Sequence, residues 1–117
     1  MLFLHYPPCT TCKKAALWLD VRGLRYTGRH IKEENPTYEE LKEWYECSGL
    51  PLKRFFNTSG LQYKALGLKD KLPAMTEYEQ LRLLATDGML VKRPILITDD
   101  GVVLTGFKEQ EWEAALF

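Results

Sequence analysis

The chain has 117 residues, 45% of them hydrophobic and 27% charged, which is the composition of an ordinary globular domain. Its 16 basic and 16 acidic residues balance, which argues against a dedicated nucleic-acid-binding protein, whose affinity rests on neutralising phosphates. No apolar run reaches the roughly 20 residues that span a bilayer, and no basic region of a signal peptide precedes the first apolar residues. We therefore expect one cytoplasmic domain over residues 1–117, with no membrane partner.

The first thirty residues predict a strand, a loop that holds two cysteines, a helix and a second strand. The apolar run 1–6 ends at two prolines and is typical of a buried strand. The pattern of residues 13–21 predicts a helix that Gly23 ends, and residues 24–31 alternate loosely, as in a strand. The two strands of such a β-α-β unit are parallel.

Helical signals fill the middle of the chain, about residues 36–90, and predict an inserted helical region. Its first helix has two candidate N-caps, which are Asn35 followed by a proline and Thr37 in a capping box with Glu40. That helix is expected to end near Gly49. The other predicted helical stretches are 52–56, the residues from the turn 57–60 to Gly67, and the residues from the capping box 76–79 to Gly88.

The C-terminal part predicts a β-hairpin and a last helix. Arg93 and Pro94 precede a β-branched strand at 95–98, and an Asp-Asp-Gly turn leads to a returning strand at 102–104. Residues 108–116 predict the helix. The whole order predicts an α/β fold whose mixed sheet has a parallel N-terminal pair and an antiparallel C-terminal pair.

The cysteines carry the most specific chemical signal. Cys9 directly precedes a predicted helix, whose unpaired first-turn N–H groups stabilise a thiolate and lower a thiol pKa. Cys12 follows on the same side of the first turn, where its sulfur can reach Cys9 and close a disulfide. Cys47 stands alone near a helix end and is interpreted as a partly buried packing thiol. The C-x-x-C pair therefore predicts one attacking thiol and one resolving thiol.

A half zinc site is the competing interpretation of the C-x-x-C spacing. Such a site needs a second pair of ligands, and only Cys47, His5 and His30 remain to supply it. The spacing rules therefore favour redox chemistry, and we expect no metal site.

Three residues outside the pair are candidates to favour a thiolate. His5 lies near the end of the first strand, although a strand histidine also commonly faces solvent or a neighbouring side chain. Lys13 adds positive charge, although it can point into water. Arg93 becomes a partner for an anion or thiolate if its segment lies beside Cys9. Since only about 5% of X-Pro bonds are cis, the sequence alone favours a trans bond before Pro94.

These features, in this order, resemble the arsenate-reductase-like family, which includes the Spx and MgsR regulators and has the thioredoxin-like fold. The resemblance covers nearly the whole chain and rests on three segments, which are Pro8-Cys9-Thr10-Thr11-Cys12-Lys13-Lys14-Ala15, Tyr63-Lys64-Ala65-Leu66-Gly67-Leu68 and Lys92-Arg93-Pro94-Ile95. It implies a thioredoxin-like mixed sheet, and it implies either an enzyme or a regulator, because the family contains both.

The resemblance to arsenate reductases implies that Cys9 is the thiolate that attacks arsenate and that His5 is the accompanying histidine. Of the three arginines that bind the oxyanion in those enzymes, one matches Arg93, while the others fall at about Asn57 and Gly106. At about 1.5–3 kcal/mol for each charged hydrogen bond, two lost arginines predict arsenate handling that is weaker by about 10²- to 10⁴-fold. Three nearby cations are candidates to compensate: Lys53, Arg54 and Lys92.

The resemblance to Spx-type regulators implies a disulfide switch at Cys9 and Cys12 and binding to the C-terminal domain of the RNA polymerase α-subunit. The glycine of that interface falls near Pro51 here, and the arginine of the middle loop falls at Ser59. This chain therefore lacks at least one residue that is characteristic of the arsenate reductases and at least one that is characteristic of the Spx-type regulators.

The function we expect is a cytosolic thiol–disulfide oxidoreductase in which Cys9 attacks a small-molecule or protein disulfide and Cys12 resolves it. We expect no bound cofactor, with electrons supplied by glutathione, glutaredoxin or thioredoxin. The alternatives are a redox-switched regulator that binds RNA polymerase and a glutathione/glutaredoxin-dependent arsenate reductase. The residues expected to stabilise the thiolate or an anion are His5, Thr10, Thr11, Lys13 and Arg93, with Asn57 and Pro94 in the substrate loop.

Overall fold

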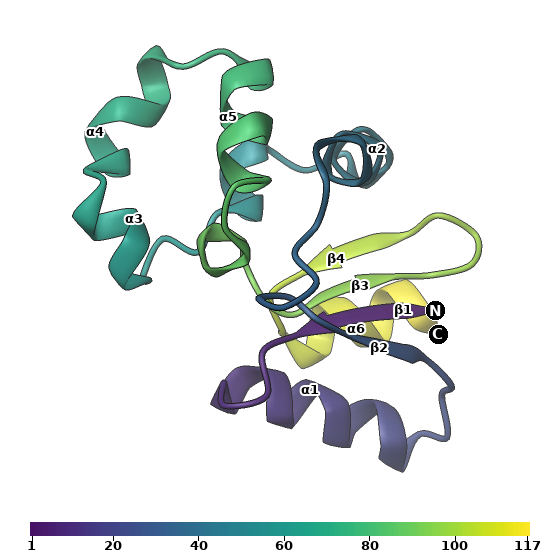
Figure 1. Ribbon diagram of the computed structural model, residues 1–117. Helices are drawn as coiled ribbons and strands as arrows, with labels where there is room; N and C mark the ends of the chain where they lie inside the picture. Colours follow the sequence, from purple (N-terminus) through teal and green to yellow (C-terminus); the bar gives the residue numbers. More distant parts are fainter.

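The computed structural model describes residues 1–117 and contains a four-stranded mixed sheet with helices on both faces (Figure 1). The strands lie in the order β2-β1-β3-β4, with β1 parallel to β2, and with β3 antiparallel to both β1 and β4. Their bounds are β1 (Leu2–His5), β2 (Thr27–His30), β3 (Ile95–Ile97) and β4 (Val103–Thr105). The α/β fold and the predicted pairing of its strands are confirmed.

Between β2 and β3 the chain is helical, where the sequence predicts an inserted region. The α-helices are α1 (Thr10–Val21), α2 (Tyr38–Ser48), α3 (Leu61–Ala65), α4 (Leu68–Lys71), α5 (Glu77–Leu84) and α6 (Glu109–Leu116), and the 3-10 helices are η1 (Leu52–Phe55), η2 (Leu72–Ala74) and η3 (Gly88–Leu90). None of these helices has the length and apolar character needed to cross a membrane. The short helices α4 and η2 were not predicted, and the helix expected to reach Gly88 ends at Leu84 because a turn and η3 follow it.

The start of α2 is fixed by the second of the two candidate caps. The Thr37 hydroxyl accepts from the Glu40 N–H at 3.1 Å, and the Glu40 carboxylate accepts from the Thr37 N–H at 3.0 Å. This capping box satisfies two N–H groups that the helix itself leaves free. Asn35 instead donates from its side chain to the Ala85 carbonyl at 2.8 Å, so it connects two segments of the insertion and caps nothing.

The alternation of side chains along β1 divides the interior into two cores. Phe3 lies on the face that α1 and α6 cover, where it belongs to a cluster with Trp18 and Trp112. Leu4 points to the opposite face and packs in the larger cluster with Leu41 of α2 and the rest of the helical insertion. Successive residues of a strand point to opposite faces, so one short strand anchors helices on both sides of the sheet (Figure 1).

Candidate active site

Three loops meet at one edge of the sheet. Leu4 pairs with Ile95 across the antiparallel strands, so the segment that leaves β1 lies beside the segment that enters β3. Ile95 in turn pairs with Thr105, which brings the end of β4 to the same edge. The cysteine loop, the Arg93–Pro94 segment and the residues after β4 are therefore neighbours, although they are distant in the sequence.

A cleft of about 650 Å³ opens at this edge, between the sheet and the helical insertion. It is lined by residues of both parts, and no carboxylate is among them. The lining residues whose chemistry matters here are Cys9, Thr11, Arg54, Asn57, Lys92, Arg93, Thr105, Gly106 and Lys108.

Cys9 is the N-cap residue of α1, and the helix begins at Thr10, earlier than the predicted residue 13. Burial by itself raises the pKa of the Cys9 thiol, but four contacts outweigh it and bring the pKa below its ordinary value. They are the N–H and the thiol of Cys12, the Arg93 guanidinium and the N–H of Thr11. The free N–H groups of a first helical turn carry partial positive charge, so the position of Cys9 at this helix start favours its thiolate form.

Cys12 lies behind Cys9 and is only 1% exposed. Burial raises the pKa of its thiol to about 12, despite the N–H of Tyr6, which donates to the Cys12 sulfur at 3.5 Å. The S–H of Cys12 donates toward the Cys9 sulfur, which raises the pKa of Cys12 and lowers that of Cys9. The two thiols thus differ in exposure, and their pKa values are shifted in opposite directions.

Arg93 places a cation beside the thiolate. Its peptide bond to Pro94 is cis, against the expectation from the frequency of such bonds. The guanidinium carbon lies 5.1 Å from the centroid of the Tyr6 ring, and the Nε and Nη1 atoms are buried without a hydrogen-bond partner. Buried guanidinium donors normally have acceptors, so Arg93 has two donor atoms that no protein group satisfies.

Positive charge also surrounds the opening of the cleft. Lys92, Lys108 and Arg54 line it together with Arg93, in a chain whose net charge is zero. Of these four, only Arg54 has an acidic partner, which is Glu111 at 3.6 Å. A cleft lined by one sign of charge raises the local concentration of ligands of opposite charge, so this arrangement suits an anionic ligand.

Thr105 and Asn57 are two of the uncharged polar residues that line the cleft. The Thr105 hydroxyl is buried without a partner, a feature that nothing in the local sequence indicates. Asn57, predicted to lie in the substrate loop, lines the cleft, and its N–H donates to the Leu90 carbonyl at 2.8 Å. Its side-chain oxygen accepts from the Ser59 hydroxyl at 3.4 Å. Thr105 and Asn57 are both uncharged, so neither adds positive charge to the cleft.

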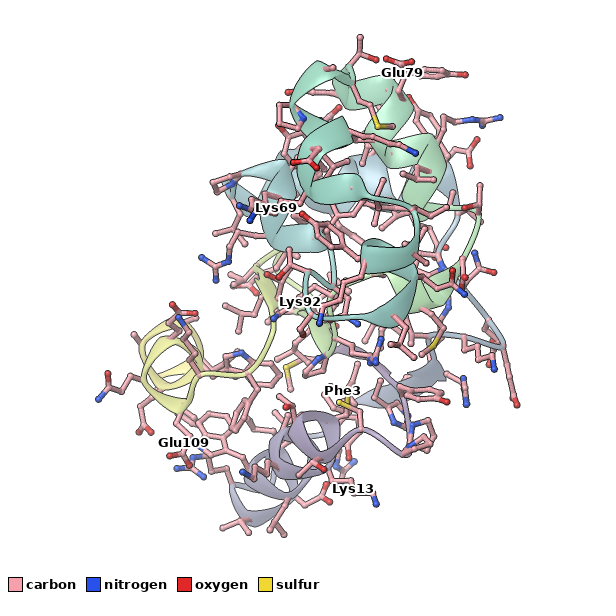
Figure 2. The ribbon with its side chains drawn as sticks, turned by 90° about the vertical axis from the view of Figure 1, so that its left-hand side faces the viewer. Phe3, Lys13, Lys69, Glu79, Lys92 and Glu109 are labelled. Carbon is pink, nitrogen blue, oxygen red and sulfur yellow. The ribbon has the colours of Figure 1, made fainter.

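The remaining sequence candidates lie away from the cleft. His5 stacks on Phe3 at 5.2 Å between ring centroids, and burial together with neighbouring His30 lowers its pKa. Thr10 and Lys13 are exposed on α1, and Figure 2 shows Lys13 on the outer side of that helix, away from Lys92. No group of His, Cys, Asp or Glu side chains is large enough to hold a metal ion.

Cys47 corrects one interpretation of the sequence. It was predicted to be a partly buried packing thiol, but its side chain is exposed near the end of α2. The face of α2 that points to the core carries Leu41, Trp44, Tyr45 and Ser48, and Cys47 lies beyond the border of that face.

Comparisons with known proteins agree with this geometry. Residues 4–115 match the sequence profile of the ArsC family. The uncharacterized protein YusI of Bacillus subtilis is 55% identical over 97% of this chain and 95% of its own length. The regulatory protein MgsR of the same organism is 33% identical over 89% of this chain and 81% of its own length. The global transcriptional regulator Spx of Staphylococcus epidermidis is 30% identical over 90% and 78%, respectively.

Solved structures of ArsC-related proteins superpose on this chain over almost its whole length. A putative ArsC family related protein from Bacteroides fragilis superposes with a TM-score of 0.93 and 58% identity, over 97% of this chain and 94% of that one. A possible arsenate reductase from Streptococcus mutans superposes with a TM-score of 0.87 and 43% identity, over 96% of each chain. The predicted thioredoxin-like fold is confirmed, and the relatives include two regulators and a possible arsenate reductase.

Proposed function

The chain belongs to the ArsC family, and on that premise we propose that it is a cytosolic thiol–disulfide oxidoreductase in which Cys9 attacks and Cys12 resolves. The observation that carries the proposal is the opposite perturbation of two neighbouring thiols. The pKa of Cys9 is lowered at the mouth of the cleft, while burial raises that of Cys12 to about 12. An exchange reaction needs one thiolate that is ready to attack and one thiol that waits until the first has reacted.

The reaction proceeds in two displacements. The Cys9 thiolate attacks one sulfur of a disulfide, the S–S bond breaks, and the first product leaves as a thiolate that takes a proton from water. Cys12 then gives up its proton and attacks the Cys9 sulfur, which forms the Cys9–Cys12 disulfide and releases the second product thiol. Two electrons pass from the protein dithiol to the substrate, and glutathione, glutaredoxin or thioredoxin would return them.

The groups around Cys9 support each of these steps. Arg93 and the N–H groups of Thr11 and Cys12 stabilise negative charge on the Cys9 sulfur. This favours the Cys9 thiolate before it attacks, and also its release if the mixed disulfide is broken again. Thr10 and Lys13 lie in the first turn of α1 and would affect Cys9 only by adding to the positive charge at that end of the helix. We assign no contact with the thiolate to His5, which packs on Phe3. Asn57 lines the cleft, whereas Pro94, which follows Arg93 and directly precedes β3, is not among the lining residues.

Counting the thiols released from a disulfide by the reduced protein tests the proposal. Wild type releases two thiols for each chain, Cys12→Ser releases one and keeps the other as an adduct, and Cys9→Ser releases none. Cys47→Ser is the matched control, because this exposed thiol lies outside the cleft and its loss leaves two thiols released. Full activity of Cys9→Ser would overturn the assignment.

A redox-switched regulator is the second candidate, and the similarity to MgsR and Spx over most of the chain favours it. In that case the Cys9–Cys12 pair would change the binding of RNA polymerase rather than reduce a substrate. Capture by the C-terminal domain of the RNA polymerase α-subunit, with the protein oxidised and reduced, tests this candidate. Capture in only one redox state supports it, and no capture in either state removes it.

A further inference from the structure

We propose that Lys92, seated over Gly106, forms a second anion-binding position in the cleft and selects small disulfides that carry carboxylate or phosphate groups. This inference rests on the proposed function and names the substrate class of the same site. Arg93 serves the reacting sulfur, and Lys92 binds a charged group elsewhere on the same substrate.

The first observation is the contact between Lys92 and Gly106. A Cβ atom placed on Gly106 would lie only 3.0 Å from Cε of Lys92 and 3.9 Å from its Nζ. The lysine stem thus occupies the space that a side chain at position 106 would need. Gly106 also has a φ of +69°, which residues with a side chain rarely adopt. Glycine at this position therefore makes room for the lysine.

The second observation is that both backbones are held in place. The Lys92 N–H donates to the Phe55 carbonyl of the insertion at 2.8 Å, and the Gly106 N–H donates to the Pro94 carbonyl at 2.8 Å. The Trp112 ring N–H donates to the Gly106 carbonyl at 3.0 Å. The Lys92 backbone is thus bonded to the insertion, and Figure 2 shows Lys92 between the helices of the insertion and α1.

The third observation is unsatisfied polar capacity beside Lys92. Lys92 has no acidic partner. Thr105, which is only 5% exposed and lines the same cleft, has a buried hydroxyl without a partner, as do Nε and Nη1 of Arg93. A buried hydroxyl without a partner costs free energy, and an acceptor oxygen of a ligand that reached Thr105 on binding would recover that cost, while Arg93 serves the reacting sulfur. These residues therefore point to a ligand that carries its own negative charge.

Rate constants for reduction of three disulfides test the proposal. Glutathione disulfide carries carboxylates, coenzyme A disulfide carries phosphates, and hydroxyethyl disulfide is neutral. We expect Lys92→Gln to slow one or both anionic disulfides by about tenfold, as the loss of one charge-assisted contact does, and to leave the neutral disulfide unchanged. The anionic disulfide whose rate constant falls more shows whether Lys92 prefers a carboxylate or a phosphate group. Gly106→Ala, which displaces the lysine, produces the same selective loss.

Lys42→Gln is the matched control, because it removes the same charge from an exposed position on α2 outside the cleft. Equal slowing of the neutral and anionic disulfides by Lys92→Gln, or no slowing of either, would overturn the second position and leave the proposed function standing. No reduction of any disulfide by wild type would overturn the proposed function, and the substrate class with it.

Discussion

The Arg93 guanidinium lies over the ring of Tyr6, with 5.1 Å between its central carbon and the ring centroid. The backbone of Tyr6 holds both cysteines as well. Its carbonyl accepts from the Cys9 N–H at 2.9 Å, and its N–H donates to the Cys12 sulfur at 3.5 Å. Tyr6 thus contacts all three groups of the exchange reaction, which are the attacking thiol of Cys9, the resolving thiol of Cys12 and the cation of Arg93.

Arg93→Ala is expected to raise the pKa of Cys9. The arginine stabilises the thiolate and not the thiol, so its loss leaves burial, which raises the pKa, less opposed. The rate of Cys9 alkylation against pH should inflect at a lower pH in wild type than in the variant. Lys42→Gln should leave the profile unchanged. The same inflection in wild type and Arg93→Ala would show that the guanidinium does not act on the thiolate.

Tyr6→Leu is expected to have a smaller effect of the same sign. It removes the ring below Arg93 and keeps the backbone hydrogen bonds to both cysteines. A cation–π contact contributes about 0.5–1 kcal/mol, so alkylation of Cys9 at neutral pH should slow by about two- to fivefold. Tyr6→Phe retains the ring and should behave as wild type. A loss in Tyr6→Phe that equals the loss in Tyr6→Leu would assign the effect to the hydroxyl instead.

The sequence was sufficient where the signal is local. The capping boxes at Thr37 and Thr76 and the hairpin before β4 depend on neighbouring residues, and all lie where predicted. The site depends on strand register, which a single sequence does not display. Tyr6 and Thr105 enter the site only because β1 pairs with β3 and β3 pairs with β4. The position of His5 near the strand end leaves open whether it faces the thiolate or a neighbouring side chain, and strand alternation puts it on the same face as Phe3, on which it stacks.

The ion pair between Arg29 and Glu40 predicts a pH-dependent part of the stability. Arg29 donates to both carboxylate oxygens, at 2.6 and 2.9 Å, and so joins β2 to the start of α2. The arginine, aided by the Thr37 N–H, lowers the pKa of Glu40 in the folded state. The contribution is therefore present above the ordinary glutamate pKa of about 4.3 and is lost as the pH falls through the lowered value.

Glu40→Gln should accordingly lower the free energy of unfolding by about 1–2 kcal/mol at pH 7. The difference from wild type should shrink as the solution is made more acidic than the ordinary glutamate pKa, since the wild-type carboxylate then becomes protonated too. Urea unfolding at several pH values measures this difference. Glu43→Gln, on the exposed side of the same helix, is the control and should leave the stability unchanged. A Glu40→Gln deficit that is constant with pH would contradict the electrostatic account.

Arsenate reduction is expected to be weak. The resemblance to arsenate reductases implies that two of the three oxyanion-binding arginines fall at about Asn57 and Gly106 here, and both of these residues line the cleft without charge. With glutathione and glutaredoxin supplied, turnover should be about 10²- to 10⁴-fold below that of an enzyme with all three arginines. Arg93→Ala should remove the remaining turnover. A rate equal to that of the three-arginine enzyme would show that Lys92 or Arg54 replaces the missing charges.

The division of labour between Cys9 and Cys12 is tested most directly by a glutathione redox titration, followed by alkylation trapping and mass spectrometry. The account predicts that wild type forms an internal Cys9–Cys12 disulfide and that Cys12→Ser accumulates one glutathione adduct on Cys9. It predicts this because the lowered pKa of Cys9 makes it the attacking group, while buried Cys12 reacts only with the adduct. A wild-type protein that forms no internal disulfide and retains the adduct on Cys9 would contradict the account and indicate a single-thiolate mechanism.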